Sequence, residues 1–317
     1  MSAVSKPYGD IQMCDIGLNF TDEVYDGVYR GKVKHPSDRK EVLERAWNVG
    51  VSKIMITAGN LEETKQALAL ARTDPRLYST VGIHPTRCSE FKEEEADSII
   101  AELIALAKEG KEMKKIVAIG EFGLDYDRLF FCDKERQNKY FRKQFEIVRA
   151  VDLPLFLHER SCDDDFIQVF NDMDPEHKLR GCVHSFTGSK EMAKRLLSMG
   201  FYIGFNGSGM RTEESLDVIK SVPLEKILIE TDGPYCAITS AHASYAYVKT
   251  KFESKRVEKY DPKYLVKGRV EPCCVLSVLE VIAAVHGVSV EEAAKIIYRN
   301  TLELYFPWEL CLVCWNQ

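Results

Sequence analysis

The sequence lacks any long hydrophobic run. No stretch approaches the roughly 18 uninterrupted apolar residues of a membrane span, and the first ten residues, MSAVSKPYGD, contain no apolar core of a secretory signal. We therefore expect a protein without a membrane partner that resides in the cytoplasm, the nucleus or both.

An excess of positive charge is also missing. The chain has 43 Lys and Arg residues against 49 Asp and Glu residues, which gives a formal net charge of -6. A protein of this charge does not attract polyanions through bulk electrostatics. A nucleic-acid partner would have to be held by a local basic patch or by a metal ion.

The sequence lacks the motif of a structural zinc site and the motif of a dinucleotide-binding fold. The ten cysteines are scattered and include a single C-x-x-C pair, Cys311 and Cys314, whereas a structural zinc site needs four ligands. Without a secretory signal, we expect reduced thiols. No G-x-G-x-x-G follows the first predicted strand, and GFNGSG follows only the seventh, which argues against a dinucleotide-binding fold.

Eight short apolar runs have strand character. They are Gln12–Ile16, Lys53–Thr57, Tyr78–Gly82, Ile116–Gly120, Pro154–His158, Gly181–His184, Phe201–Phe205 and Ile227–Glu230. Segments with helical periodicity lie between them, at residues 39–49, 62–71, 96–108, 134–151, 164–171, 190–199 and 212–221. Strands that alternate with helices predict a parallel sheet. Eight such units in 317 residues favour an α/β fold of the (β/α)₈ TIM-barrel class.

The remainder of the chain fits one domain over residues 1–317, with a core at about residues 12–306. After Asp232 we expect an extended loop of the last βα unit, reaching to about Glu271. Helical patterns follow at residues 273–286 and 290–299, and a Ser289-to-Glu292 capping box opens the second of these.

Four residues of metal-binding type close four of the apolar runs. Glu121 follows the fourth run, His158 and His184 end the fifth and sixth runs, and Asp232 lies two residues after the eighth run. The carboxyl ends of barrel strands face one rim, so these side chains are expected to converge there. Two carboxylates and two imidazoles can hold a divalent ion and leave positions for water and substrate. Taken singly, each residue also fits a capped strand end or a core histidine.

An ordered set of motifs resembles a known family. The motifs are DIGLNFTD, YRGKVKH, TAGN, STVGIHPTR, IGEFGLDYDR, LPLFLHER, VHSFTGS, YIGFNGSG, IETDGPYC and YRNTLELY, between about Cys14 and Phe306. They resemble the TatD family of metal-dependent deoxyribonucleases in the amidohydrolase superfamily, and look closest to its eukaryotic members. The resemblance implies a TIM-barrel phosphodiesterase with metal ligands at the four positions above. His84 matches a family position near the phosphate or the leaving group.

One departure from the family bears on the number of metal ions. Many relatives carry His-x-His at the end of the first strand, where this chain has Gly17 and Asn19. We therefore expect one tightly held ion, with Asp15 or Asn19 as weak ligands of a second. Carboxylates and phosphate favour Mg²⁺ or Mn²⁺, whereas imidazoles also suit Zn²⁺. We expect Mg²⁺ to support turnover.

Catalytic roles follow from the residue types. Asp232 can orient or deprotonate the attacking water, and Glu121 is expected to be the central ligand. The candidates for phosphate contact are Arg87, Arg128, Arg160 and Arg211, with Arg160 preferred because it lies two residues beyond a ligand. Residues 125–127 are either pocket-shaping groups or an ordinary polar loop.

The segment Lys249–Arg269 has the composition of a single-strand binder. It contains eight Lys or Arg residues and three acidic residues, with three aromatic residues between them. Basic groups follow a phosphate backbone and aromatic rings stack on bases. The alternative is a solvated insertion loop.

We predict a monomeric, metal-dependent deoxyribonuclease that acts as a 3′–5′ exonuclease on single-stranded or frayed DNA, with RNA as a further possible substrate. The same barrel also serves other chemistry. One alternative is a metal-dependent C–N hydrolase, against which stand the missing His-x-His and Glu121 in place of a bridging Lys. The other alternative is a non-catalytic nucleic-acid-binding or scaffold barrel.

Overall fold

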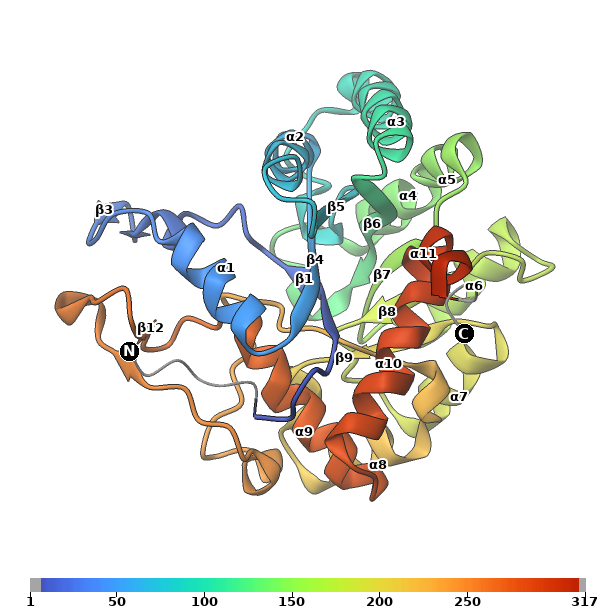
Figure 1. Cartoon of the computed structure of the whole chain (residues 1–317). Helices are drawn as coiled ribbons and strands as arrows, with labels where there is room; N and C mark the ends of the chain where they lie inside the picture. The colour runs from blue at the N-terminus through green and yellow to red at the C-terminus, as the bar shows by residue number, and fades with distance from the viewer. Residues whose placement is uncertain (1–6, 314–317) are drawn as a thin grey trace. The chain divides into compact units, whose positions relative to one another are not determined.

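The computed structural model describes residues 7–313 (Figure 1). Cys314 of the C-x-x-C pair and the first six residues of the chain lie outside the described residues. The chain divides into two compact units. The first comprises residues 1–55 and 205–300, and the second comprises residues 56–204 and 301–317. That they act as one domain stays a prediction.

Eight principal strands alternate with helices. They are β1 (Met13–Leu18), β4 (Val51–Ile56), β5 (Leu77–Val81), β6 (Ile116–Asp125), β7 (Leu155–Arg160), β8 (Gly181–His184), β9 (Tyr202–Phe205) and β10 (Ile227–Ile229). Their order in the sheet is their order along the chain. Each coincides with one predicted apolar run, so the predicted (β/α)₈ barrel class is confirmed.

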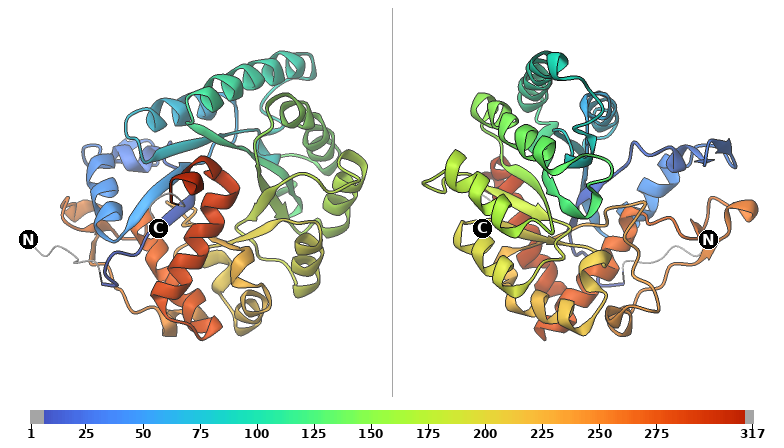
Figure 2. Two further views of the ribbon diagram at one scale, coloured as in Figure 1. Left: turned by 45° about the vertical axis from the view of Figure 1, so that its right-hand side comes forward. Right: turned by 180° about the vertical axis from the view of Figure 1, so that it is seen from behind.

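In the second unit, helices follow the strands. They are α2 (Leu61–Ala71), α3 (Ala96–Glu112), α4 (Lys134–Lys143), α5 (Phe145–Val151), α6 (Asp163–Met173) and α7 (Lys190–Ser198). Helix α3 runs beside α2 and α5 (Figures 1 and 2). α11 (Pro307–Val313) also belongs to this unit. Strands β5 to β8 pair in parallel, and Leu155 of β7 lies opposite Gly181 of β8.

One helix prediction is wrong. Residues 134–151 form two helices because the chain turns at Gln144. The buried side chain of Gln144 pairs with the backbone at the end of β5: its Oε1 accepts from Ile83 N at 2.7 Å, and its Nε2 donates to Ile83 O at 2.9 Å. The apolar periodicity runs through this position and does not reveal the break.

In the first unit, β10 returns beside β1. Asp232 N donates to Gly17 O at 2.7 Å, and Asn19 N donates to Gly233 O at 2.8 Å. The helices of this unit are α1 (Arg39–Asn48), α8 (Glu213–Ser221), α9 (Val275–His286) and α10 (Val290–Tyr305), whose last turn lies beyond residue 300. Glu292 N donates to Ser289 Oγ at the start of α10, as the capping pattern predicts.

Shorter elements complete the structure. Strands β2 (Val28–Tyr29) and β3 (Lys32–Val33) form one ribbon, and β11 (Ser254–Lys255) pairs with β12 (Leu265–Val266). The 3₁₀ turns are η1 (Glu23–Asp26), η2 (Pro85–Arg87), η3 (Glu93–Glu95), η4 (Tyr126–Arg128), η5 (Gly207–Met210), η6 (Leu224–Lys226), η7 (Ala243–Tyr247), η8 (Val257–Lys259) and η9 (Pro272–Cys274). These elements are too short to be predicted from periodicity.

The extended loop of the first unit is fixed by a buried ion-pair network. Arg269 donates to Asp38 at 2.8 and 2.6 Å and to Glu271 at 2.8 Å, while Arg45 Nε donates to Glu271 at 2.7 Å. Asp38, Arg269 and Glu271 are buried. Arg269 therefore stabilises the fold and is not an accessible charge of the segment Lys249–Arg269.

Among the described residues, no single helix is long and apolar enough to cross a membrane. The segments Pro272–His286 and Val290–Tyr305 pass such a test only together, and they are bent by 109°.

Candidate metal centre

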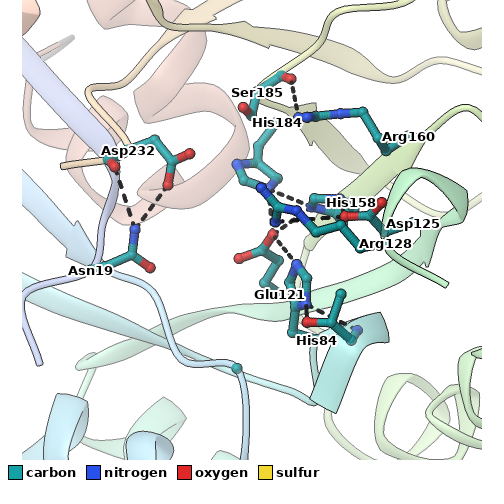
Figure 3. A network of polar contacts seen from close by, with 12 residues as sticks. Asn19, His84, Glu121, Asp125, Arg128, His158, Arg160, His184, Ser185 and Asp232 are labelled. Carbon is teal, nitrogen blue, oxygen red and sulfur yellow. Dashed lines mark hydrogen bonds and ion pairs between the residues drawn. The ribbon is translucent and has the colours of Figure 1, made fainter. Parts of the chain in front are cut away.

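Three of the predicted ligands lie together in the second unit. Glu121 belongs to β6, His158 to β7 and His184 to β8, and all three are buried. His158 and His184 occupy opposite positions of two parallel strands. Glu121 Oε1 lies 2.6 Å from His158 Nδ1 and 2.7 Å from His184 Nε2, and the two ring nitrogens are 3.4 Å apart (Figure 3).

This donor set fits a divalent ion. One carboxylate oxygen and two imidazole nitrogens lie within 4.8 Å of one another, and these are ligand types that divalent transition metals accept. Burial opposes a charge on Glu121, but His184, His84 and His158 outweigh it and hold its pKa well below the usual value. An ionised carboxylate beside two imidazoles is the form that binds metal.

Two glycines allow β6 to approach β7 at this point. Gly123 has a φ of +151°, and a Cβ atom there would lie 1.9 Å from His158 O. Gly120 has a φ of +145°, and its Cβ would lie 2.0 Å from Phe156 O. Only glycine adopts this backbone and permits this contact. The two glycines thereby position Glu121 beside the histidines.

A second group of ligand type shares His158. Asp125 Oδ2 lies 3.2 Å from His158 Nε2, and His84, Asp125 and His158 also form a potential metal-binding set. Asp125 is fully buried. Asp125 was predicted to be either a pocket-shaping group or part of an ordinary polar loop, and not a ligand. The missed signal is strand periodicity, because residues four apart on a strand point to the same face.

His84 presents a neutral ring to the cluster. Thr86 N donates to His84 Nδ1 at 3.1 Å, so the neutral ring carries its proton on Nε2, which lies 3.3 Å from Glu121 Oε1. Burial lowers the pKa of His84. His84 is therefore a hydrogen-bond donor directed at the cluster, a property that its predicted position near phosphate requires.

The four predicted phosphate-binding arginines differ in their surroundings. Arg160, the last residue of β7, has a buried Nε without a hydrogen-bond partner among the described residues. The Nη2 atom of Arg160 makes a long contact with Ser185 O, at 3.4 Å. A buried donor without a partner is costly, and an anion would satisfy it.

The other three arginines have weaker support. Arg128 is half exposed, and its Nη1 lies 3.7 Å from Asp125 Oδ2. Arg87 is paired with Glu63 at 2.6 Å and with Glu90 at 2.8 Å. Arg211 is exposed and lies in the first unit. Phosphate contact stays a prediction for all four.

Asp232 lies in the first unit, three residues after the end of β10. Asn19 Nδ2 donates to its Oδ1 at 2.9 Å (Figure 3), and Cys236 Sγ lies 3.2 Å from its Oδ2. These contacts orient the carboxylate and favour a positioning role for Asn19. The convergence of Asp232 with the three ligands of the second unit stays a prediction.

Asp15 has structural contacts. Its Oδ1 accepts from Thr231 N at 2.8 Å and from Gly17 N at 3.3 Å, and its Oδ2 accepts from Thr231 Oγ1 at 2.5 Å. Asp15 is fully buried. These bonds tie β1 to the end of β10 and favour a structural role over the predicted weak second-metal role.

Comparison with known proteins agrees with the motifs. The family model described as TatD related DNase matches residues 15–306. The chain is 42% identical to the deoxyribonuclease Tat-D of Schizosaccharomyces pombe over 298 residues, which cover 93% of this chain and 96% of that protein. It is 36% identical to the 3'-5' ssDNA/RNA exonuclease TatD of Salmonella typhimurium over 228 residues, covering 70% and 79%.

A solved structure shows the same fold. The hydrolase TatD family protein of Entamoeba histolytica superposes with a TM-score of 0.88 at 36% sequence identity, covering 94% of this chain and 99% of that protein.

Proposed function

Because the chain belongs to the family of TatD-related DNases, we propose that it is a metal-dependent exonuclease that removes nucleotides from the 3′ ends of single-stranded or frayed DNA. The observation that carries the proposal is the approach of one Glu121 oxygen to both His158 and His184, at 2.6 and 2.7 Å. Similarity to the 3'-5' ssDNA/RNA exonuclease TatD of Salmonella typhimurium supports the polarity and leaves RNA as a second substrate.

Glu121, His158 and His184 would hold the ion, and we propose that Asp232 completes the set. When bound, a divalent ion supplies positive charge for the phosphate and lowers the pKa of a water molecule. Mg²⁺ is the proposed ion for turnover, because hard phosphate and carboxylate oxygens favour it. The proposal includes a monomer that acts in the cytoplasm or the nucleus.

His84, Arg160 and Asp232 have further roles in the proposed reaction. The Nε2–H of His84 and the guanidinium of Arg160 would donate hydrogen bonds to phosphate oxygens, which hold the scissile group near the cluster. Asp232 would accept the proton of the attacking water on Oδ2, while Asn19 holds Oδ1. His84 stays neutral because its Nδ1 is committed to a backbone donor.

Cleavage of labelled oligonucleotides tests the function. A single strand labelled at its 5′ end should yield a ladder that shortens from the 3′ end, and a covalently closed duplex should resist cleavage. Exhaustive chelation should abolish the ladder, and Mg²⁺ or Mn²⁺ should restore it. Full activity after chelation, or internal cuts in closed duplex at the same rate, would contradict the proposal.

Cleavage by Glu121→Gln is the control for a contaminating nuclease. Protein prepared in the same way should lose the metal-dependent ladder. A ladder of equal intensity from the variant would mean that another protein produces it.

A further inference from the structure

Three consecutive apolar side chains are exposed in the loop after β6. Leu129, Phe130 and Phe131 are 42%, 78% and 58% exposed, and we call these residues the aromatic tip. The two phenylalanine rings lie against each other, with centroids 4.4 Å apart. An adjacent group of exposed large apolar side chains marks a contact surface, in contrast to single scattered ones.

The loop that carries the aromatic tip is held at both ends by one buried side chain. Gln137 Nε2 donates to Asp125 O and to Cys132 O, both at 2.8 Å, and Gln137 Oε1 accepts from Asp125 N at 2.7 Å. Gln137 is fully buried. Phe131 N also donates to Arg128 O at 3.0 Å. The rings are thus presented to solvent by an anchored turn, which lowers the entropy cost of binding.

The loop that carries the aromatic tip begins beside the metal centre. Asp125, where the loop begins, contacts His158 at 3.2 Å, and Arg128, one residue before the tip, lies 3.7 Å from Asp125 (Figure 3). The loop therefore begins at the cluster and reaches the aromatic tip four residues later.

Two basic side chains flank the aromatic tip, beside the exposed carboxylates of Asp127 and Asp133. Arg128 precedes it and is 50% exposed, and Lys134 follows it and is 58% exposed. Lys134 is paired with Asp165 at 2.7 Å and lies 4.8 Å from the centroid of the Tyr126 ring. Basic groups that flank aromatic rings are the arrangement that binds single strands, because every base offers a face for stacking.

The size of the aromatic tip argues against a large partner. A phenylalanine buries at most about 150–250 Å², so two rings and a leucine fall short of the roughly 800 Å² per partner of a standard protein interface. A nucleobase has dimensions that match one or two rings.

We propose that Phe130 and Phe131 form a stacking platform for the bases of a single strand whose phosphate lies at the metal centre. This inference rests on the proposed nuclease function and adds a binding site to it. The platform reads no base identity, since stacking tolerates all four bases. It favours unpaired over paired nucleotides, because only an unpaired base can leave its neighbours to stack on protein.

The test compares Phe130→Ser/Phe131→Ser with wild-type enzyme on a single-stranded oligonucleotide. We expect KM to rise about tenfold or more, a loss typical of a removed stacking contact, with a smaller change in kcat. Phe130→Tyr/Phe131→Tyr should retain the wild-type KM because the ring faces remain. Met113→Ser is the matched control, since Met113 is also exposed, at 40%, in the same unit.

An abasic strand shows whether a base is the occupant. Removing bases next to the scissile nucleotide should raise KM for the wild-type enzyme and have little further effect on the double-serine variant. Additive effects would overturn the platform. An unchanged KM in the double-serine variant would also overturn the platform. This includes the result that the variant keeps its KM but loses a concentration-dependent dimer. Failure of the wild-type enzyme to cleave any strand would overturn the nuclease function itself.

Discussion

Glu121 Oε1 lies 2.6 Å from His158 Nδ1, a contact that joins two neighbouring strands at the metal centre. His158 also contacts Asp125 through its other ring nitrogen, at 3.2 Å. Burial lowers the pKa of His158, but the hydrogen bonds with Asp125 and Glu121 outweigh it and raise the pKa. The ring is therefore fixed from both sides, and the same Glu121 oxygen also lies 2.7 Å from His184 Nε2.

Glu121→Gln should remove the metal-dependent activity. The amide keeps the size of the side chain but lacks the negative charge that pairs with a cation. Loss of a group that merely orients a metal ligand costs about 10–100-fold, so loss of a direct ligand should cost at least about 100-fold in kcat/KM. The increase in melting temperature on addition of Mn²⁺ should also disappear.

Glu94→Gln provides the control for that experiment. Glu94 is exposed in η3, and its replacement removes the same charge at a position outside the cluster. A variant Glu121→Gln that retained both activity and the Mn²⁺-dependent stabilisation would exclude Glu121 as a ligand.

Gly123→Ala should destabilise the protein more than an ordinary glycine replacement. The added Cβ would meet His158 O at 1.9 Å, and the φ of +151° is unfavourable for alanine. Gly200→Ala separates these two effects, because Gly200 has a φ of +89° but no atom within 4 Å of an added Cβ. We expect a loss of about 1 kcal/mol for Gly200→Ala and about 3 kcal/mol or more for Gly123→Ala in urea unfolding. Equal losses would show that the contact with β7 is unimportant.

Asp15 should make stability depend on pH. Burial raises the pKa of Asp15 to about 8, although the hydrogen bonds from Thr231 oppose the shift. An unfolded Asp titrates at about 3.9, so the folded state favours the protonated form. The resulting stabilisation is complete below the unfolded pKa and is lost as the pH rises through about 8.

Urea unfolding of wild-type protein and Asp15→Asn at several pH values, with chelator present, checks this expectation. The stability of Asp15→Asn should fall less than that of wild-type protein between pH 5 and pH 9. Parallel pH profiles for the two proteins would place the pKa of Asp15 outside this range.

The sequence was sufficient to predict the barrel class and to bring three of the four predicted ligands together. Strand runs such as Gly181–His184 agree with β8 to the residue, because a buried parallel strand needs a continuous apolar run. Glu121, His158 and His184 could be placed together because parallel strands bring their carboxyl ends to the same edge. These inferences depend only on periodicity and chain direction.

Features that depend on individual side-chain contacts could not be predicted. The break at Gln144 arises from its pairing with Ile83, which no local pattern encodes. Arg269 was counted among the basic residues of the segment Lys249–Arg269, but its side chain is buried and paired with Asp38. Asp38 lies more than 200 positions away in the sequence. The exposure of Phe130 also could not be predicted from the sequence, because an apolar residue is expected in the core.

Asp232→Asn should impair turnover more than substrate binding. Asn19 donates to Oδ1 of Asp232 at 2.9 Å, and the amide of an asparagine can present an oxygen to the same donor. The replacement therefore preserves the orientation of the side chain and removes its basicity. Proton transfer by a positioned base contributes about 10²–10⁴-fold, and we expect a fall of that order in kcat. The affinity for a single strand should change little, since Arg160 and His84 are intact.

Metal content, measured on the same preparation, separates loss of the base from loss of the ion. A metal-replete Asp232→Asn enzyme with a near-normal kcat would show that Asp232 is not the base. In that case Asn19→Ala would lower kcat only by unfolding part of the protein. If Asp232 is the base, Asn19→Ala should instead reduce kcat at temperatures where both proteins are fully folded, because the carboxylate loses the partner that orients it.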